Sequence, residues 1–211
     1  MIIDKETLSN YESRYRALFI NSLAGIKQAF LIGTKSKDAC SNLAIFNSLL
    51  HIGAKPPLWG FVCRPDVIKR DTLNNILETN QYTINYVTSN YFEKAHQTSA
   101  KYDKEVSEFE ACGFTEQYLL NFNAPFVTEA HIKVAMKLEQ KIELTINNTI
   151  LIIGSIEHIE MDENIISSDG FVALDKANTL SCAGLDAYYE TRLIDRLSYA
   201  RPYQPITKLL Y

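Results

Sequence analysis

Hydrophobic and polar residues follow one another in short runs along most of the chain, and this spacing predicts strands. Strands are expected over residues 28–34, 42–50, 58–63 and 82–87. The last of these alternates as a strand with one buried face does. Two longer runs, residues 134–146 and 149–158, flank Asn147-Asn148. Because asparagine tolerates the positive φ of a tight turn, we predict a hairpin there.

Helical spacing is confined to a few segments. Residues 5–19 bring apolar side chains together three and four positions apart, with Asp4 placed to cap the helix. Shorter helices are expected near residues 71–79, 91–97 and 106–111. Since strands outnumber helices and do not alternate with them, the pattern favours a mainly β, antiparallel barrel with peripheral helices. We expect one domain over residues 1–211, with an N-terminal helix (about 5–19) and a C-terminal extension (about 190–211).

Composition narrows the range of partners. The net charge of -4 leaves no basic field for nucleic acid. No apolar run approaches the length of about twenty residues that a spanning helix needs, so no membrane partner is expected. The four cysteines are widely spaced without a C-x-x-C pair. This spacing predicts reduced thiols and a cytoplasmic protein.

Several kinds of catalytic site are disfavoured by missing motifs. With eight glycines, the chain has neither G-x-G-x-x-G nor a P-loop. No G-x-S-x-G elbow supports a hydrolase. The four histidines stand alone, without the spacing of metal ligands, so no metal site is expected. No side chain is identified as catalytic.

Two segments point to a ligand. Residues 41–48 form an apolar run interrupted by small amides and hydroxyls, and residues 70–76 form a charged turn that enters a helix. A phosphate prefers N–H donors at a helix start, a hydroxyl and a cation. Thr72 offers the hydroxyl, and Lys69 and Arg70 the charge. From the residues alone two plainer alternatives stay open, namely a simple N-cap with a solvated Lys-Arg pair and an edge strand or bulge at 42–48.

The order of six segments resembles the flavin reductase-like, FMN-binding split-barrel family. These segments are residues 42–48, 57–66, 70–76, 106–114, 124–130 and 151–159. The resemblance extends over roughly residues 20 to 200. It implies a six-stranded antiparallel split barrel of Greek-key type, a homodimer, and FMN at the dimer interface. NADH or NADPH would reduce the flavin, or electrons would pass to a protein partner.

The resemblance also implies which residues contact FMN. The cofactor-binding residues expected from it are Asn42, Ala44, Phe46, Asn47 and Ser48 along the ring and ribityl chain, Cys63 and Arg64 close by, Lys69, Arg70, Thr72 and Asn75 near the phosphate, and His158 near the ring.

One segment departs from the family pattern. Many members have a Gly-Arg-rich stretch followed by tyrosine, whereas this chain has Gly184-Leu185-Asp186 followed by Tyr188 and Tyr189. Nicotinamide binding is therefore left open. The expected function is an FMN-dependent NAD(P)H:flavin oxidoreductase. The alternatives are a flavoredoxin-like electron carrier and a dimeric barrel that has lost flavin.

Overall fold

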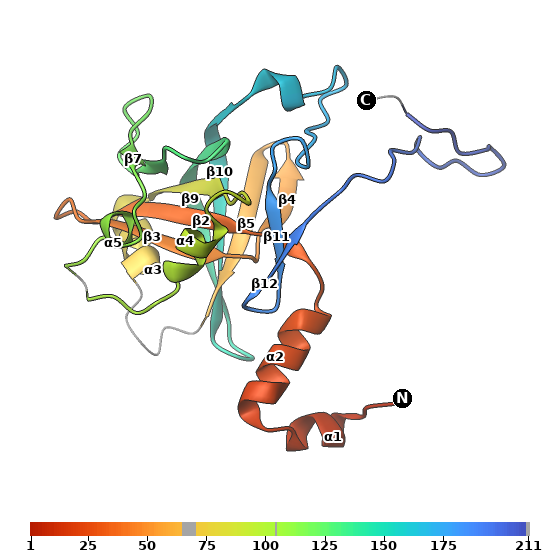
Figure 1. The fold of residues 1–211 in the computed structure, drawn as a ribbon, viewed down its shortest axis with the longest axis horizontal. Coiled ribbons are helices and arrows are strands. Elements are labelled where there is room, and N and C mark those ends of the chain that lie inside the picture. The colour runs from red at the N-terminus through yellow and green to blue at the C-terminus, as the bar shows by residue number, and fades with distance from the viewer. Residues whose placement is uncertain (65–70, 104, 210–211) are drawn as a thin grey trace.

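The computed structural model describes residues 1–64, 71–103 and 105–209, and is dominated by one curved antiparallel sheet (Figure 1). Within the described residues this sheet has seven strands in the order β3-β2-β6-β9-β10-β5-β4. Every pairing in it is antiparallel. The mainly β, antiparallel fold is thus confirmed. The strands are β2 (Phe30–Lys35), β3 (Ser41–Phe46), β4 (Leu50–Ala54), β5 (Pro57–Cys63), β6 (Gln81–Tyr86), β9 (Ile132–Leu144) and β10 (Thr149–Met161).

Two smaller sheets lie beside the main one. A three-stranded sheet has the order β1-β11-β12, and β7 pairs with β8. The strands are β1 (Lys27–Gln28), β7 (Glu116–Gln117), β8 (Phe126–Val127), β11 (Leu180–Ala183) and β12 (Ala187–Glu190). Strands β11 and β12 are absent from the elements predicted above. Strands of four residues are too short to show a convincing alternation.

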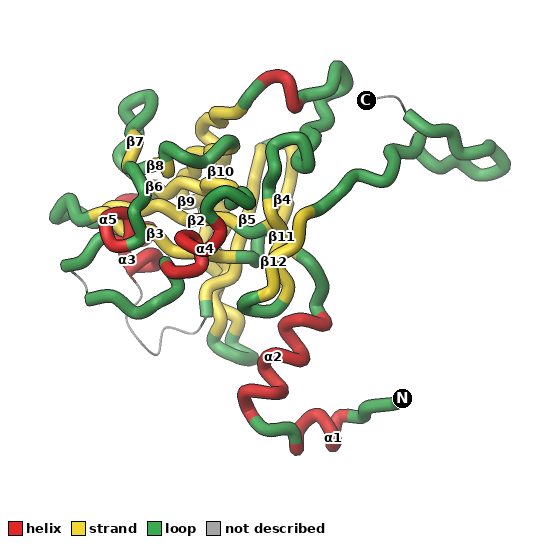
Figure 2. The backbone as a smooth tube through the Cα atoms, viewed as in Figure 1, coloured by secondary structure: helices red, strands yellow, loops and turns green. Residues whose placement is uncertain are grey.

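The helices are short and lie outside the sheet (Figure 2). They are α1 (Lys5–Asn10), α2 (Ser13–Leu23), α3 (Asp71–Thr79), α4 (Phe92–Gln97) and α5 (Glu108–Ala111), with a 3-10 helix at Glu163–Ile165. The single helix expected over residues 5–19 is wrong. The backbone turns extended at Tyr11, and the Glu12 side chain accepts a hydrogen bond from Tyr15 N at 2.9 Å, which caps a second helix.

The run at residues 42–50 is also divided. β3 ends at Phe46 and β4 begins only at Leu50. Between them, Ser48 Oγ accepts a hydrogen bond from Val62 N at 3.0 Å and donates one to Val62 O at 3.2 Å. These two bonds hold the link against β5, so the predicted single strand becomes two strands joined by a bend.

Strand β6 is buried on both faces, not on one as its alternation predicted. The reason is a second layer outside the sheet, where Thr83 Oγ1 donates to Pro125 O at 2.6 Å. The predicted hairpin of β9 and β10 is confirmed, and Asn148 in its turn has φ 57.

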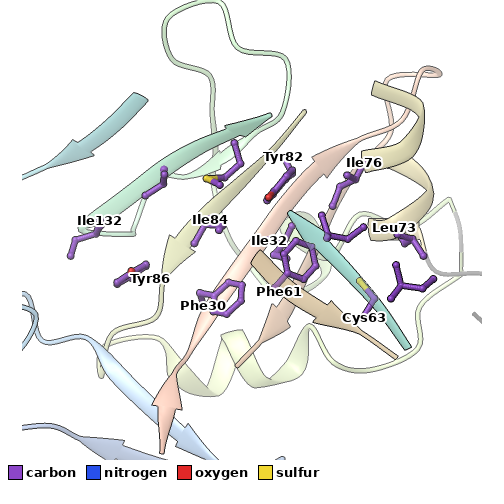
Figure 3. Close-up of a cluster of buried hydrophobic side chains, with 14 of the residues drawn as sticks. Phe30, Ile32, Phe61, Cys63, Leu73, Ile76, Tyr82, Ile84, Tyr86 and Ile132 are labelled. Carbon is purple, nitrogen blue, oxygen red and sulfur yellow. The ribbon is translucent and has the colours of Figure 1, made fainter. Parts of the chain in front are cut away.

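The main hydrophobic core fills the inner face of the curved sheet (Figure 3). Phe30, Phe61 and Tyr82 are fully buried there, and Leu73 and Ile76 of α3 close one end. Full burial of one such side chain stabilises a fold by about 1.5–3 kcal/mol. The core therefore fixes α3 against the strands that carry the predicted site. None of the helices in the described part is long and apolar enough to cross a membrane.

Candidate functional site

A buried polar cluster fixes the first turns of α3 to β2 and β3. Asn42 Nδ2 donates to Thr72 Oγ1 at 2.9 Å, and Asn75 Nδ2 donates to Thr34 Oγ1 at 3.1 Å. All four residues are buried. Buried polar groups are stable only when they are hydrogen-bonded, so these two pairs fix where α3 begins. Three predicted site residues, Asn42, Thr72 and Asn75, are thereby brought together.

The Thr72 hydroxyl keeps a donor in this arrangement. A threonine hydroxyl has one hydrogen to donate and two lone pairs to accept with. In the bond from Asn42 it acts as the acceptor. Its hydrogen is therefore not used in that bond. Lys69 and Arg70, the predicted cations beside it, lie outside the described residues.

An open hollow beside the cluster is acidic. Its lining includes Asp71, Asp103 and Glu108 as well as Cys40 and Asn75. Burial raises the pKa of the Glu108 carboxyl, and the nearby Asp71 raises it further, whereas a hydrogen bond from Leu43 N opposes both. That bond is 3.1 Å long. The carboxylates make this hollow unfavourable for a phosphate, so an anion at α3 would have to lie away from it.

The other end of β3 leads into the core and then bends. The Phe46 ring lies 6.0 Å from that of Phe30 and 5.2 Å from that of Phe61. Cys63 is 2% exposed in the same core. Phe46 and Cys63, both predicted to bind the cofactor, thus form part of the apolar core at this end of β3. Ala44 is half-buried on β3 opposite Ile32, and Arg64 is exposed where β5 ends.

The bend after β3 lies against the segment that departs from the family pattern. Asn47 Nδ2 donates to Gly184 O at 2.9 Å. Gly184 has φ +64 in the turn between β11 and β12, a conformation that favours glycine. Sequence reasoning did not connect these two sites. The only signal was the Gly-Leu-Asp turn itself, which does not tell where in the fold it packs.

Cys182 and Tyr188 extend this end of the site. They are opposite one another on β11 and β12, and the Tyr188 hydroxyl lies 2.9 Å from His96 Nδ1. Burial raises the pKa of the Cys182 thiol, and a hydrogen bond with Asn47 opposes that shift. Burial also raises the pKa of Tyr188 to about 12. Both groups are therefore neutral at ordinary pH.

The predicted site residue His158 does not lie at either end of β3. Its ring lies 5.5 Å from both Phe122 and Phe126, which form a small cluster separate from the main core. His158 Nε2 is buried and has no hydrogen-bond partner among the described residues. The structure therefore separates His158 from Phe46 and Asn47.

Comparisons with known proteins agree with this fold. The family model described as "Flavin reductase like domain" matches residues 26–179. A "putative flavin reductase with split barrel domain" from Shewanella frigidimarina NCIMB 400 is 46% identical, with a TM-score of 0.92, over 95% of this chain and 100% of that one.

Two more distant relatives follow. An uncharacterized protein of Halalkalibacterium halodurans is 28% identical over 93% of this chain and 96% of its own. The flavoredoxin of Desulfovibrio vulgaris (Miyazaki F) is 22% identical, with a TM-score of 0.69, over 84% of this chain and 91% of that one, and shows a shared fold. The predicted resemblance is confirmed, and the chain belongs to the flavin reductase-like family of split-barrel proteins.

Proposed function

We propose that this chain binds FMN and works as an NAD(P)H-dependent flavin oxidoreductase. The observation that carries the proposal is the position of β3 between two sets of polar groups. Asn42 joins Thr72 at one end, and Asn47 joins Gly184 beyond the other. The strand from Asn42 to Phe46 spans about 13 Å. An elongated ligand with a phosphate at one end and a flat ring at the other suits a strand of this length with polar groups at both ends.

The residues at the start of α3 fit a phosphate. Thr72 has a hydroxyl hydrogen left to donate, and the first N–H groups of a helix attract an anion. We expect Lys69 and Arg70 to supply the positive charge. Because Asp71, Asp103 and Glu108 line the hollow beside Asn42 and Asn75, we expect the phosphate to lie at the Thr72 hydroxyl and outside that hollow.

FMN, when bound, carries the hydride or electron chemistry itself, which is why no catalytic dyad is needed. The chain's own residues bind and orient. Phe46 and Cys63 give apolar support from the core, and Asn47 fixes the bend beside the ring end. Arg64, exposed at the end of β5, supplies positive charge there. We expect His158 to lie away from this site, since it packs against the rings of Phe122 and Phe126.

We also propose that the chain works as a homodimer, as the family resemblance implies. Two copies would bring two sets of β3 and α3 residues into one assembly. In the alternative function, an electron-transfer protein takes the place of NAD(P)H as the partner that exchanges electrons with the flavin.

Absorption spectroscopy of the purified protein tests the proposal. We expect a flavin absorption band at about 450 nm, which is a property of the cofactor. We also expect the protein to oxidise NADH or NADPH when FMN is added. A colourless protein that does not bind added FMN would contradict flavin binding.

A flavoredoxin-like carrier is the second candidate. The contact between Asn47 and Gly184 favours it, because the turn that departs from the family pattern then lies beside the proposed ring end, where it would hinder a nicotinamide. Bound flavin without NAD(P)H oxidation, but with reduction by a protein partner, would support this candidate over the first.

A further inference from the structure

Both ends of the chain leave the barrel. In α1 and α2, all of whose residues the structure describes, no residue is buried. After β12 the C-terminal arm, defined here as residues 191–209, extends away from the sheet (Figure 1). None of its residues, all within the described part, is buried.

The C-terminal arm is rich in exposed apolar side chains. Ile194 is 94% exposed, Tyr199 89% and Tyr203 106%. Leu197 and Ile206 are more than half exposed. Apolar surface of this size is unfavourable in water, and contiguous exposure of it marks an interaction site.

The arm is ordered within itself. Ser198 N donates to Thr207 O at 2.9 Å, and Leu209 N donates to Arg196 O at 2.8 Å. Asp195 and Lys208 form an ion pair. Even a regular two-stranded hairpin is only marginally stable in water when isolated, so an arm closed by the single β-bridge between Leu197 and Lys208 needs a surface to pack on.

Its base is fixed to the body of its own chain. Arg196 forms a two-pronged ion pair with Asp169, with Nη2 to Oδ2 at 2.5 Å, and its guanidinium lies 4.1 Å from the centre of the Phe171 ring. These contacts direct the rest of the arm outward. The apolar side chains beyond Arg196 are therefore not covered by the body of their own chain.

The surface area of the chain supports this conclusion. The accessible surface is 13306 Å². A compact monomer of 24.0 kDa is expected to expose about 9,900 Å². The excess of roughly 3,400 Å² on one chain is larger than the area of about 800 Å² that each partner contributes to a standard interface.

The distribution of charge favours a second copy of this chain as the molecule that covers the arm. Residues 191–211 contain four Lys and Arg and one Asp, a net charge of +3, whereas residues 1–190 contain 17 Lys and Arg and 24 Asp and Glu, a net charge of -7. A cationic arm is attracted by an anionic body, and a second copy of this chain offers that body. Symmetric dimers of identical chains are the commonest soluble oligomers.

We propose that the C-terminal arm of each chain lies on the body of a second copy, so that the two arms are exchanged across the dimer. This inference rests on the dimer proposed above and specifies what holds it together. Residues Ile194, Tyr199 and Tyr203 are then interface residues and not free surface.

Two full-length variants with matched positions test the proposal. Ile194→Asp places a charge on the arm, and Ile146→Asp places the same charge at the tip of the hairpin between β9 and β10. Both isoleucines are almost fully exposed, at 94% and 93%. Circular dichroism verifies that each variant is folded.

Analytical ultracentrifugation over a range of concentrations gives the dimer dissociation constant. We expect Ile194→Asp to raise it by about tenfold or more, as for a central interface residue, and Ile146→Asp to change it less than about twofold. A monomeric parent protein, or equal constants for both variants, would overturn the proposal. Flavin absorbance is recorded in the same runs. A flavin-binding protein with an unaffected dimer defeats the arm exchange alone, and a colourless protein with an arm-dependent dimer defeats the flavin proposal alone.

Discussion

The side-chain amide of Asn47 donates a hydrogen bond to the carbonyl oxygen of Gly184 at 2.9 Å, across 137 residues of sequence. It joins the bend after β3 to the turn between β11 and β12. The same turn contacts α2, since a Cβ at Gly184 would lie 3.6 Å from Leu18 Cδ1. This hydrogen bond thus joins the predicted ring end of the site to the sheet β1-β11-β12, whose β11–β12 turn lies beside α2.

Asn47→Ala removes this hydrogen bond. We expect the free energy of unfolding to fall by about 1 kcal/mol, because the Gly184 carbonyl loses its partner in a half-buried position. FMN retention should weaken as the bend loosens. Asn21→Ala is the matched control, since Asn21 Nδ2 also donates to a backbone carbonyl, at 2.7 Å from Ala17 O, but in exposed α2. Chemical denaturation with and without FMN measures both effects. Equal losses in the two variants would show that the contact with Gly184 has no special weight.

Thr72→Val separates the two roles of the threonine hydroxyl. Valine leaves the Asn42 amide unsatisfied in a buried place, which costs about 1–3 kcal/mol of stability, and removes the donor offered to a phosphate. Thr72→Ser keeps the hydroxyl and should retain FMN. Fluorescence titration with FMN measures the dissociation constant, and denaturation of the flavin-free protein measures the stability. If Thr72→Val remains folded and binds FMN as tightly as Thr72→Ser, the phosphate does not use this hydroxyl.

Arg70→Ala tests the positive charge expected beside Thr72 at the phosphate end of the site. The residue lies outside the described part of the chain, so the expectation rests on the family resemblance. We expect weaker FMN binding and a shallower loss of affinity as salt increases, because one cation near the phosphate is gone and salt has fewer charge contacts to screen. Isothermal titration at two salt concentrations measures this. An unchanged affinity would place the phosphate elsewhere.

His158→Leu tests the separation of this histidine from the flavin site. The buried Nε2 has no partner among the described residues, so leucine should preserve or raise the free energy of unfolding, by up to about 1 kcal/mol. FMN affinity should not change. His51→Leu is the control on exposed β4. A loss of FMN binding in His158→Leu alone would return this residue to the site.

Glu108 should make stability depend on pH. Burial raises its pKa in the folded chain above the unfolded value. The folded state is then favoured by protonation, and this contribution is lost as pH rises through the raised pKa. Glu108→Gln removes the titration while its amide oxygen still accepts the hydrogen bond from Leu43 N. We expect the melting temperature of the variant relative to the parent to rise from pH 4 to pH 7. A difference in melting temperature that stays constant over this pH range would contradict the expectation.

Local signals were strong enough to predict much of the main sheet. The β9–β10 hairpin follows from two apolar runs around Asn147-Asn148, and α3 follows from the charged turn and its apolar face, Leu73 and Ile76. The prediction of one strand over residues 42–50 is wrong, because the bonds of Ser48 to Val62 that bend the chain join residues 14 positions apart. β6 was expected to have one buried face, because nothing local shows that Pro125 and Val127 cover the other.

The sequence by itself determined the class of fold, most strands of the main sheet and the residue types at both ends of the predicted site, since periodicity and turn chemistry act over a few neighbouring residues. Only the tertiary structure decided which of those residues meet. It paired Asn42 with Thr72 and Asn47 with Gly184, and it set His158 apart among other rings. It also left the C-terminal arm uncovered. These outcomes depend on contacts between distant segments, which the curvature of the whole sheet fixes and no local pattern records.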